Sequence, residues 1–371
     1  MEDIIVRGAP AEYVYKSGVL NELEEKLQLR SIQRVLIVSG VKSWNAARYY
    51  FPNLKSIQVS HTFYKGECSL TEINRVSTLA QTDGVDAIIG VGGGKVLDVV
   101  KAAASASRTK SVLIPTLASN CAPWTPLSVI YSDEGVMTHY DVYPMSVDIL
   151  LVEPRILVEA PAPLLIAGIG DTLAKWYEAD VQIRRLTHPP VALKVAHHTA
   201  RLCAEEMFAH AEEAIADAKE AQVSESFKKV VESIIMLGGM VGGFGDKFGR
   251  IAGAHSIHNG MTIAPESHEA LHGNKVAYGI LVQLLLEQKE SEVERLLPFY
   301  HKLGLPSSLR ELNISDTWID EIAVHSTREE ESIHNMRSEK ITATEVSQVM
   351  RDLESFQLVK SPIMIEVKTN P

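Results

Sequence analysis

The sequence has few cysteines and no long apolar run. Its 371 residues include only Cys68, Cys121 and Cys203, which are widely spaced and odd in number, so a disulfide framework is not expected. No stretch is apolar over the length needed to span a bilayer, and the N-terminal residues lack the hydrophobic segment of a secretory signal. These absences predict a cytoplasmic protein without a membrane partner.

Positive charge is also scarce. The chain has 36 Lys and Arg against 47 Asp and Glu, for a formal net charge of −11, and it shows no basic stripe. This balance argues against a nucleic-acid partner. A hydrophobic content of 46% and a charged content of 22% are ordinary for a globular protein, and the length is sufficient for two domains.

The first 160 residues alternate apolar, β-branched runs with helical patterns. The predicted strands are residues 34–39, 85–91, 111–115 and 146–152, and the predicted helices are residues 69–79 and 95–104. Such alternation is typical of a parallel sheet with right-handed crossovers. We therefore predict a Rossmann-like α/β domain over residues 1–160.

The pattern changes after Pro154. Proline recurs at positions 161 and 163, and long amphipathic stretches follow. They predict an all-helical domain over residues 161–371. Within it, the segment from Gly168 to Asp171 is predicted to open a helix, and the run from Arg328 to Glu331 is predicted to be solvated surface.

A glycine cluster, Gly90-Val-Gly92-Gly93-Gly94-Lys95, lies between a predicted strand and a predicted helix. Glycine lets the backbone approach a phosphate, and the amides at a helix N-terminus favour an anion. The cluster matches neither G-x-G-x-x-G nor a Walker A loop, so a plain tight turn stays open. Thr116 and Ser119 follow the next predicted strand, where they would contact the same nucleotide or cap a turn.

Asp171, His255 and His272 lie in three separate short motifs. One carboxylate and two imidazoles, with a coordination position left open, form the ligand set of a catalytic zinc or iron site. His258 follows His255 by three residues and would share its helix face, although a lone histidine is more often a packing residue. A metal and a dinucleotide in one chain predict hydride transfer.

Taken together, the motifs resemble the glycerol dehydrogenase branch of the iron-containing alcohol dehydrogenases and, within it, the bacterial hydroxycarboxylate dehydrogenases. The resemblance runs in order through G-V-G-G-G-K-V-L-D, I-P-T-L-A-S, C-A-P-W-T-P, G-D-T-L-A-K-W-Y-E-A and A-H-S-I-H-N-G. It implies a dinucleotide-binding α/β domain, a helical domain and an active site in the cleft between them. It also implies a nicotinamide cofactor, a small-molecule substrate, a divalent metal (zinc expected, iron the alternative) and a homo-oligomer.

The resemblance assigns roles to individual residues. The implied metal ligands are Asp171, His255 and His272. The implied cofactor contacts are Gly93, Gly94, Lys95, Asp98, Thr116, Ser119, Leu127 and Tyr131. His258 would lie near the reacting end of the bound substrate and cofactor, where it would relay a proton or support the metal ligands.

Two positions depart from glycerol-oxidising relatives. Cys121 stands where those relatives have an aspartate that helps to hold the polyol, and Lys175 stands where they have a small residue. Lys175 follows Asp171 by four residues, so it would rise toward the metal or extend to solvent. A protonated lysine can pair with a substrate carboxylate. These departures predict reduction of a 2-oxo carboxylic acid to the 2-hydroxy acid, with glycerol dehydrogenase as the alternative.

A third departure concerns the cofactor. NAD-specific relatives carry an aspartate just after the second strand, where this chain reads Val38-Ser-Gly-Val-Lys42-Ser. An acid there repels the 2′-phosphate of NADP, whereas a lysine accepts it. We therefore expect Lys42 to contact the cofactor and NADP(H) to be used at least as well as NAD(H).

Two rival functions share these features. A sugar-phosphate cyclase-like lyase would use a metal and NAD, but it needs several basic groups for a substrate phosphate, and none cluster near the ligand motifs. A non-catalytic nucleotide-binding protein would not need an intact ligand set. The sequence therefore favours a dehydrogenase.

Overall fold

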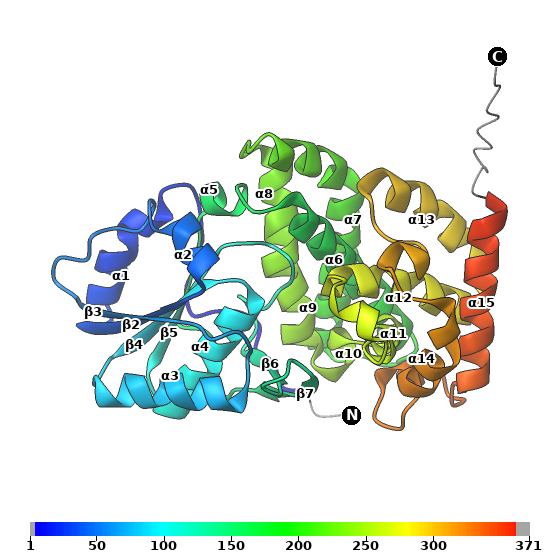
Figure 1. Ribbon diagram of the computed structural model, residues 1–371, viewed down its shortest axis with the longest axis horizontal. Helices are drawn as coiled ribbons and strands as arrows, with labels where there is room; N and C mark the ends of the chain where they lie inside the picture. The colour runs from blue at the N-terminus through cyan, green and yellow to red at the C-terminus, as the bar shows by residue number, and fades with distance from the viewer. Residues whose placement is uncertain (1–3, 361–371) are drawn as a thin grey trace, which may run out of the picture. The chain divides into compact units, whose positions relative to one another are not determined.

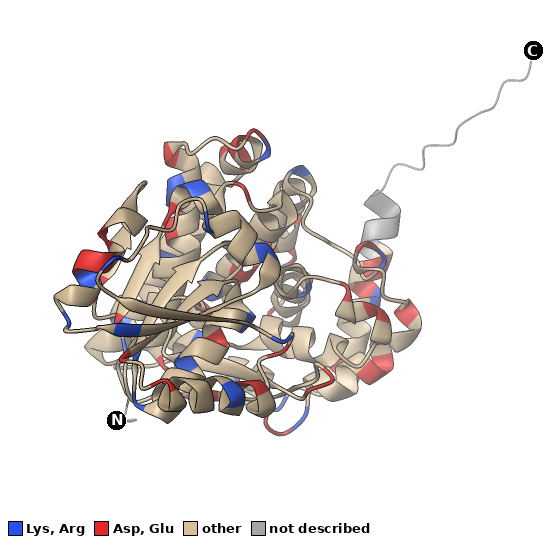
Figure 2. Ribbon diagram, turned by 60° about the vertical axis from the view of Figure 1, so that its left-hand side comes forward, with Lys and Arg blue, Asp and Glu red and all other residues tan. Residues whose placement is uncertain are grey.

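The computed structural model describes residues 4–360. Contacts within the chain divide it into two compact units, Met1–Arg250 (unit 1) and Ile251–Pro371 (unit 2), which are described separately. None of the described helices is both long enough and apolar enough to cross a bilayer. Acidic and basic residues are intermixed along the ribbon of each unit (Figure 2).

Unit 1 contains a six-stranded parallel sheet in the order β1-β8-β5-β4-β2-β3. Its strands are β1 (Tyr13–Tyr15), β2 (Arg34–Ser39), β3 (Gln58–Phe63), β4 (Ala87–Gly92), β5 (Lys110–Pro115) and β8 (Ile149–Val152). A separate antiparallel hairpin pairs β6 (Leu127–Tyr131) with β7 (Met137–Val142). The four predicted strands correspond to β2, β4, β5 and β8, which confirms the parallel α/β domain. The edge strands β1 and β3 were not predicted, because they lack the continuous apolar run of a buried strand.

Helices cover both faces of this sheet (Figure 1). One face carries α1 (Leu23–Gln28), α2 (Val41–Ala47) and α5 (Pro154–Leu157), and the other carries α3 (Leu70–Thr82) and α4 (Gly94–Ser107). Val35 and Ile37 of β2 pack in the same cluster as Leu23 of α1, while Gly90 of β4 lies against Leu97 of α4. Because both faces are buried, the central strands consist almost wholly of apolar residues.

The rest of unit 1 is helical. It comprises α6 (Ala162–Ile183), α7 (Val191–Lys219), α8 (Glu225–Glu232), α9 (Gly238–Gly245) and α10 (Lys247–Arg250). Helix α6 begins directly after Pro161 and carries Pro163 in its first turn, where a missing N–H costs nothing. The predicted helix start at Gly168 is therefore wrong, and Asp171 lies in mid-helix.

The regular elements among the described residues of unit 2 are all helices. Its main helices are α11 (Gly253–Met261), α12 (His272–Leu286), α13 (Glu290–Leu303), α14 (Ile319–Ser326) and α15 (Ala343–Lys360). Among residues 4–360 the last strand ends at Val152, close to the predicted change of structure at residue 161. That change falls within unit 1, and the assignment of separate functions to residues 1–160 and 161–371 stays a prediction.

Candidate active site

Strands β4 and β5 end side by side at the carboxyl edge of the sheet, where their register pairs Gly92 with Pro115. The chain turns at Gly93 and begins α4 at Gly94. The amide of Thr116 donates to the carbonyl of Gly92 at 3.0 Å. This is the edge at which open α/β sheets bind ligands. Three predicted cofactor residues, Gly93, Gly94 and Thr116, are therefore brought together there.

The turn at Gly93 is closely packed against the loop that follows β5. A Cβ added to Gly93 would lie 3.0 Å from Cδ2 of Leu117. No side chain caps the first turn of α4, so its amides face an incoming anion. Contact between this turn and the pyrophosphate of a dinucleotide stays a prediction.

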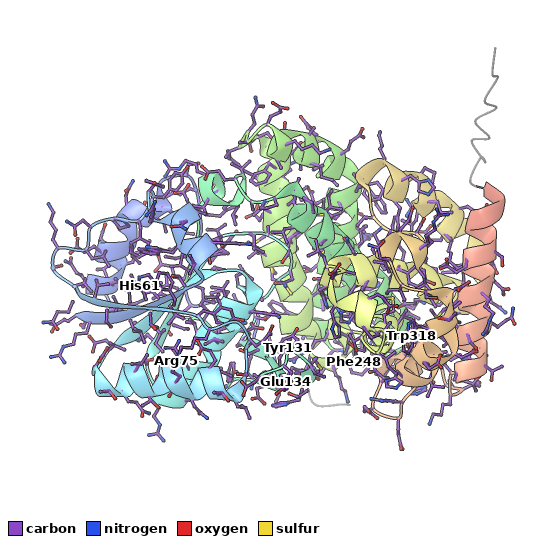
Figure 3. All side chains as sticks on the ribbon, in the orientation of Figure 1. His61, Arg75, Tyr131, Glu134, Phe248 and Trp318 are labelled. Atoms are coloured by element: carbon purple, nitrogen blue, oxygen red, sulfur yellow. The ribbon has the colours of Figure 1, made fainter. Side chains whose placement is uncertain are left out.

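Lys95 lies in the first turn of α4, and its ammonium already has protein partners. Its Nζ is 2.7 Å from the carboxylate of Glu67 and 4.9 Å from the ring centre of Tyr131, which Figure 3 labels at the end of β6. Two predicted cofactor residues, Lys95 and Tyr131, are therefore neighbours. Glu67, which sequence reasoning missed, would compete with a phosphate for the charge of Lys95.

Asp98 is buried and bound to the protein itself. Its carboxylate accepts a hydrogen bond from a backbone amide of β6 at 3.1 Å and lies 2.8 Å from Nζ of Lys101. Lys101 also donates to the carbonyls of Ala122 (2.7 Å), Thr125 (3.0 Å) and Leu127. Burial raises the pKa of Asp98, while Lys101 opposes that shift. The pair ties α4 to the segment 122–127, and the predicted cofactor contacts of Asp98 and Leu127 stay predictions.

At the end of β2, Lys42 is exposed in the first turn of α2. Nearby, Ser39 shares a hydrogen bond of 2.8 Å with Nε2 of His61 on β3 (Figure 3), and the Trp44 ring lies 4.6 Å from that imidazole. Burial lowers the pKa of His61. An uncharged imidazole and an indole therefore lie beside the residues expected to contact the adenosine end of the cofactor. Neither was singled out from the sequence, because β3, which carries His61 to the side of Ser39 and Trp44, was not recognised.

Helix α6 packs closely against the loop that follows β5. A Cβ added to Gly168 would lie 2.4 Å from the carbonyl oxygen of Ala118 and 3.0 Å from Cα of Ser119. Asp171 follows Gly168 by three residues, so it lies on the same side of the helix, and it is buried. The contact at Gly168 therefore positions both the Ser119 loop and Asp171.

Replacing Gly168 with alanine is expected to lower the free energy of unfolding by about 1–3 kcal/mol and to raise KM for NAD(H), because the methyl group forces α6 away from the loop. The matched control is Gly242→Ala in α9, where the added carbon would lie 3.6 Å from Cγ of Arg250. That change should be neutral or stabilise by up to about 1 kcal/mol, since alanine favours the helix. Urea denaturation and steady-state kinetics measure both effects. Equal outcomes for the two variants would contradict the proposed close packing.

Lys175 lies one turn beyond Asp171 and is 7% exposed, so it does not extend to solvent. Its Nζ is 4.0 Å from Oδ1 of Asp171. Burial is the largest single effect and disfavours the ammonium, but the negative charges of Asp171, Glu178 and other neighbouring groups together outweigh it. The pKa of Lys175 is therefore raised, and the side chain stays charged. Burial also raises the pKa of the Cys121 thiol, despite the opposing charge of Lys175. Cys121 is thus a small neutral group rather than a reactive thiolate.

Unit 2 brings three histidines together. His255 and His258 lie on α11, and His272 is the first residue of α12. The ring centre of His272 is 5.5 Å from that of His255 and 4.3 Å from that of His258. The amide of Ala254 donates to the side-chain oxygen of Gln283 at 3.0 Å, which joins the start of α11 to α12. The two predicted imidazole ligands are therefore close neighbours within this unit.

A chain of hydrogen bonds leads away from His272. Its Nδ1 is 3.0 Å from Nε2 of His258, and Nδ1 of His258 is 3.1 Å from Oδ1 of Asn259. Burial lowers the pKa of His258 well below its ordinary value, so that ring is neutral. Its proton then lies on Nδ1, which faces the amide oxygen, and its Nε2 accepts from Nδ1–H of His272. This direction leaves the lone pair of His272 on Nε2, the atom that a metal would need.

Glu331 is the last member of this series of hydrogen bonds. The amide nitrogen of Asn259 donates to its carboxylate at 3.2 Å, across 72 residues of sequence. Glu331 is only partly exposed, and burial raises its pKa. The prediction of solvated surface is therefore wrong for Glu331, although Arg328, Glu329 and Glu330 are exposed. No local pattern could have indicated this contact.

The comparisons with known proteins show the family of this chain. Residues 10–154 match the model of a family described as iron-containing alcohol dehydrogenase. The chain is 36% identical over 352 residues to hydroxycarboxylate dehydrogenase A of Escherichia coli (strain K12), covering 94% of this chain and 97% of that one. It is 34% identical over 335 residues to a glycerol dehydrogenase of Thermotoga maritima, covering 88% and 90% of the two chains.

Solved structures give the same result. The crystal structure of a probable glycerol dehydrogenase from Sinorhizobium meliloti 1021 matches with a TM-score of 0.87 and 28% identity, covering 96% of this chain and 100% of that chain. The glycerol dehydrogenase of Schizosaccharomyces pombe matches with a TM-score of 0.85 and 29% identity, covering 96% and 92%. These relatives are dehydrogenases, which decides against the lyase and the non-catalytic alternatives. The chain belongs to the iron-containing alcohol dehydrogenase family, and it is a nicotinamide-dependent dehydrogenase that acts on CH–OH groups.

Proposed function

We propose that this enzyme reduces a 2-oxo carboxylic acid to the 2-hydroxy acid. The observation that carries the proposal is the buried ammonium of Lys175, 4.0 Å from Asp171. Residues 116–127, which include Cys121, contain no acid that would repel an anionic substrate. If Asp171 binds a divalent cation, its charge no longer balances Lys175, and a buried ammonium needs another anion. The carboxylate of the substrate fills that role.

Asp171, His255 and His272 are the proposed ligands of one divalent cation. One carboxylate and two imidazoles fit zinc, which we propose in preference to iron. The bound cation would supply Lewis acidity at the reacting oxygen of the substrate. The chain from His272 through His258 to Asn259 orients the imidazole and holds its Nδ1 proton. His258 is therefore a positioning residue in this proposal, and Cys121 is a small neutral wall of the substrate pocket.

Replacing His258 with alanine is expected to weaken zinc binding by about tenfold, because it removes the acceptor for the Nδ1 proton of His272. His258→Gln keeps an acceptor oxygen and should retain most of the affinity. Competition with a chromophoric chelator measures both. An unchanged affinity in His258→Ala would show that the chain does not support the metal.

We propose that NADP(H) is used at least as well as NAD(H), because neutral Ser39 ends β2 and exposed Lys42 follows it, where an acid would repel a 2′-phosphate. Lys95, Gly93 and Gly94 would hold the pyrophosphate, with Thr116 and Ser119 on the neighbouring loop. A cytoplasmic location, expected from the sequence composition, and a homo-oligomer, implied by the family resemblance, complete the proposal.

Glycerol oxidation is the second candidate, since several relatives are named glycerol dehydrogenases. Nicotinamide absorbance with metal-loaded enzyme separates the two. We expect faster turnover of 2-oxoglutarate or 2-oxobutanoate with NADPH or NADH than of glycerol with NAD. Faster turnover of glycerol would overturn the carboxylate assignment and leave the dehydrogenase class intact.

A further inference from the structure

A cavity of about 330 Å³ lies on the hairpin formed by α6 and α7, within unit 1. It is lined by the end of α6, the connecting loop and the first half of α7. The polar and aromatic side chains in its wall are Trp176, Arg184, Lys194, His197, His198 and Arg201. None of them has been assigned a role in the proposed reaction.

The cavity wall gathers cations in a chain whose net charge is −11. Two carboxylates face this group. Asp180 lies 3.4 Å from Arg184 and 2.9 Å from His197, and Glu205 lies 3.3 Å from Arg201. Arg184 and Arg201 each have a carboxylate neighbour, and Lys194 adds a third permanent cation to this concave surface.

Two of these groups are available to a ligand. Lys194 and His198 make no ion pair or hydrogen bond with any residue between 4 and 360. Both are exposed and lie on α7 at positions four residues apart, so they project from the same face of the helix. An anion entering the cavity would therefore meet an ammonium and an imidazole that have no competing protein partner.

The rest of the wall is flat and apolar. The Trp176 ring stacks on His197 with ring centres 5.4 Å apart and an interplanar angle of 29°. Ile183, Leu186 and Pro189 complete that wall. A bare inorganic ion would leave this surface uncovered, whereas an organic anion would bury it.

We propose that this cavity binds a small organic dianion, either a dicarboxylate or a phosphate monoester, as a site separate from the reaction. Lys194 and Arg201 bind the charged groups, and Trp176 contacts the carbon skeleton. Trp176 directly follows Lys175 on α6 but is half-buried, whereas Lys175 is buried. The proposal does not depend on the identity of the substrate of the dehydrogenase.

The test is a calorimetric titration of the NADH-saturated, metal-loaded enzyme with succinate and with glycerol 2-phosphate, at constant ionic strength. Saturating NADH keeps the phosphate probe out of the cofactor site. Lys194→Gln and Arg201→Gln should each weaken binding by about tenfold, the usual scale for one lost charge-assisted contact. The matched control is Lys219→Gln, an exposed lysine on the same helix and outside the cavity. It should bind as the parent does.

The two probes distinguish the two classes of anion. Tighter binding of succinate assigns the cavity to a dicarboxylate, and tighter binding of glycerol 2-phosphate assigns it to a phosphate monoester. A second readout is the fluorescence of Trp176, assigned by its loss in Trp176→Phe. No saturable heat at millimolar concentrations of either probe would overturn the proposal. Equal binding by the parent and Lys194→Gln would also overturn it, since the anion would then lie elsewhere. Sedimentation showing that Lys194→Glu breaks an oligomer, without any probe binding to the parent, would instead make the cavity an interface between copies.

Discussion

Replacing His255 with alanine is expected to lower kcat by about 1,000-fold or more, which is the scale observed when a group that stabilises transition-state charge is removed. His255 is buried at the start of α11, next to His272, and the proposed metal would lose one of its three protein ligands. The affinity for NAD(H) should stay within about twofold, because the proposed cofactor residues in the glycine turn and α4 are not the residues that would lose the metal. Metal content by mass spectrometry and nicotinamide absorbance measure the two effects.

The matched control is His268→Ala. His268 is exposed and lies only four residues before His272, so it tests whether any nearby histidine matters. It should leave kcat and metal content unchanged. Dialysis of the parent against a chelator should reproduce the His255→Ala defect, and added zinc should restore only the parent. Full activity of His255→Ala after chelation would show that the metal assignment is wrong.

Replacing Lys175 with threonine is expected to lower kcat/KM for a 2-oxo acid by about 100-fold, because truncating one partner of a buried charge pair costs several kcal/mol. Turnover of glycerol, which carries no charge, should fall much less or rise. The parent and the variant are compared with both substrates by nicotinamide absorbance. The deciding quantity is the ratio of kcat/KM for the 2-oxo acid to kcat/KM for glycerol, which should fall in the variant if Lys175 recognises a carboxylate.

Lys175→Met separates charge from size, since it preserves most of the side-chain volume and removes the ammonium. An equal loss in Lys175→Thr and Lys175→Met would assign the effect to charge. A loss with threonine alone would assign it to packing around α6. Equal losses for the oxo acid and for glycerol would mean that Lys175 supports the site without recognising a carboxylate. Thermal unfolding of each variant shows whether the fold itself has changed.

Local patterns were sufficient for the features that short segments specify. The strands β2, β4, β5 and β8 lie in a sheet covered on both faces, so each is an apolar run that can be read without knowing its neighbours. The glycine turn before α4 was recognised for the same reason, since the strand, the turn and the helix are consecutive. Helix α6 was placed, but its start was not, because the opening was assigned to the segment from Gly168 to Asp171 rather than to the residues after Pro161.

Polar contacts between distant segments were decided by the tertiary structure. Glu67 reaches Lys95 across 28 residues, and Lys101 reaches three carbonyls more than 20 residues away. Edge strand β3 lacks an apolar run, so His61 could not be placed beside Ser39 from sequence. Each of these side chains looks like ordinary surface in its own segment.

The sequence by itself determined the family, the parallel sheet, the glycine turn and the candidate metal ligands, because each is encoded by a short motif or a local hydrophobic pattern. The tertiary structure decided that Lys175 is buried beside Asp171 and that His258 accepts a hydrogen bond from His272. It also decided that Glu331 is the last member of their hydrogen-bond series. The physical reason is that the charge and orientation of a buried polar group depend on desolvation and on its partners. Both are supplied by segments far away in the sequence.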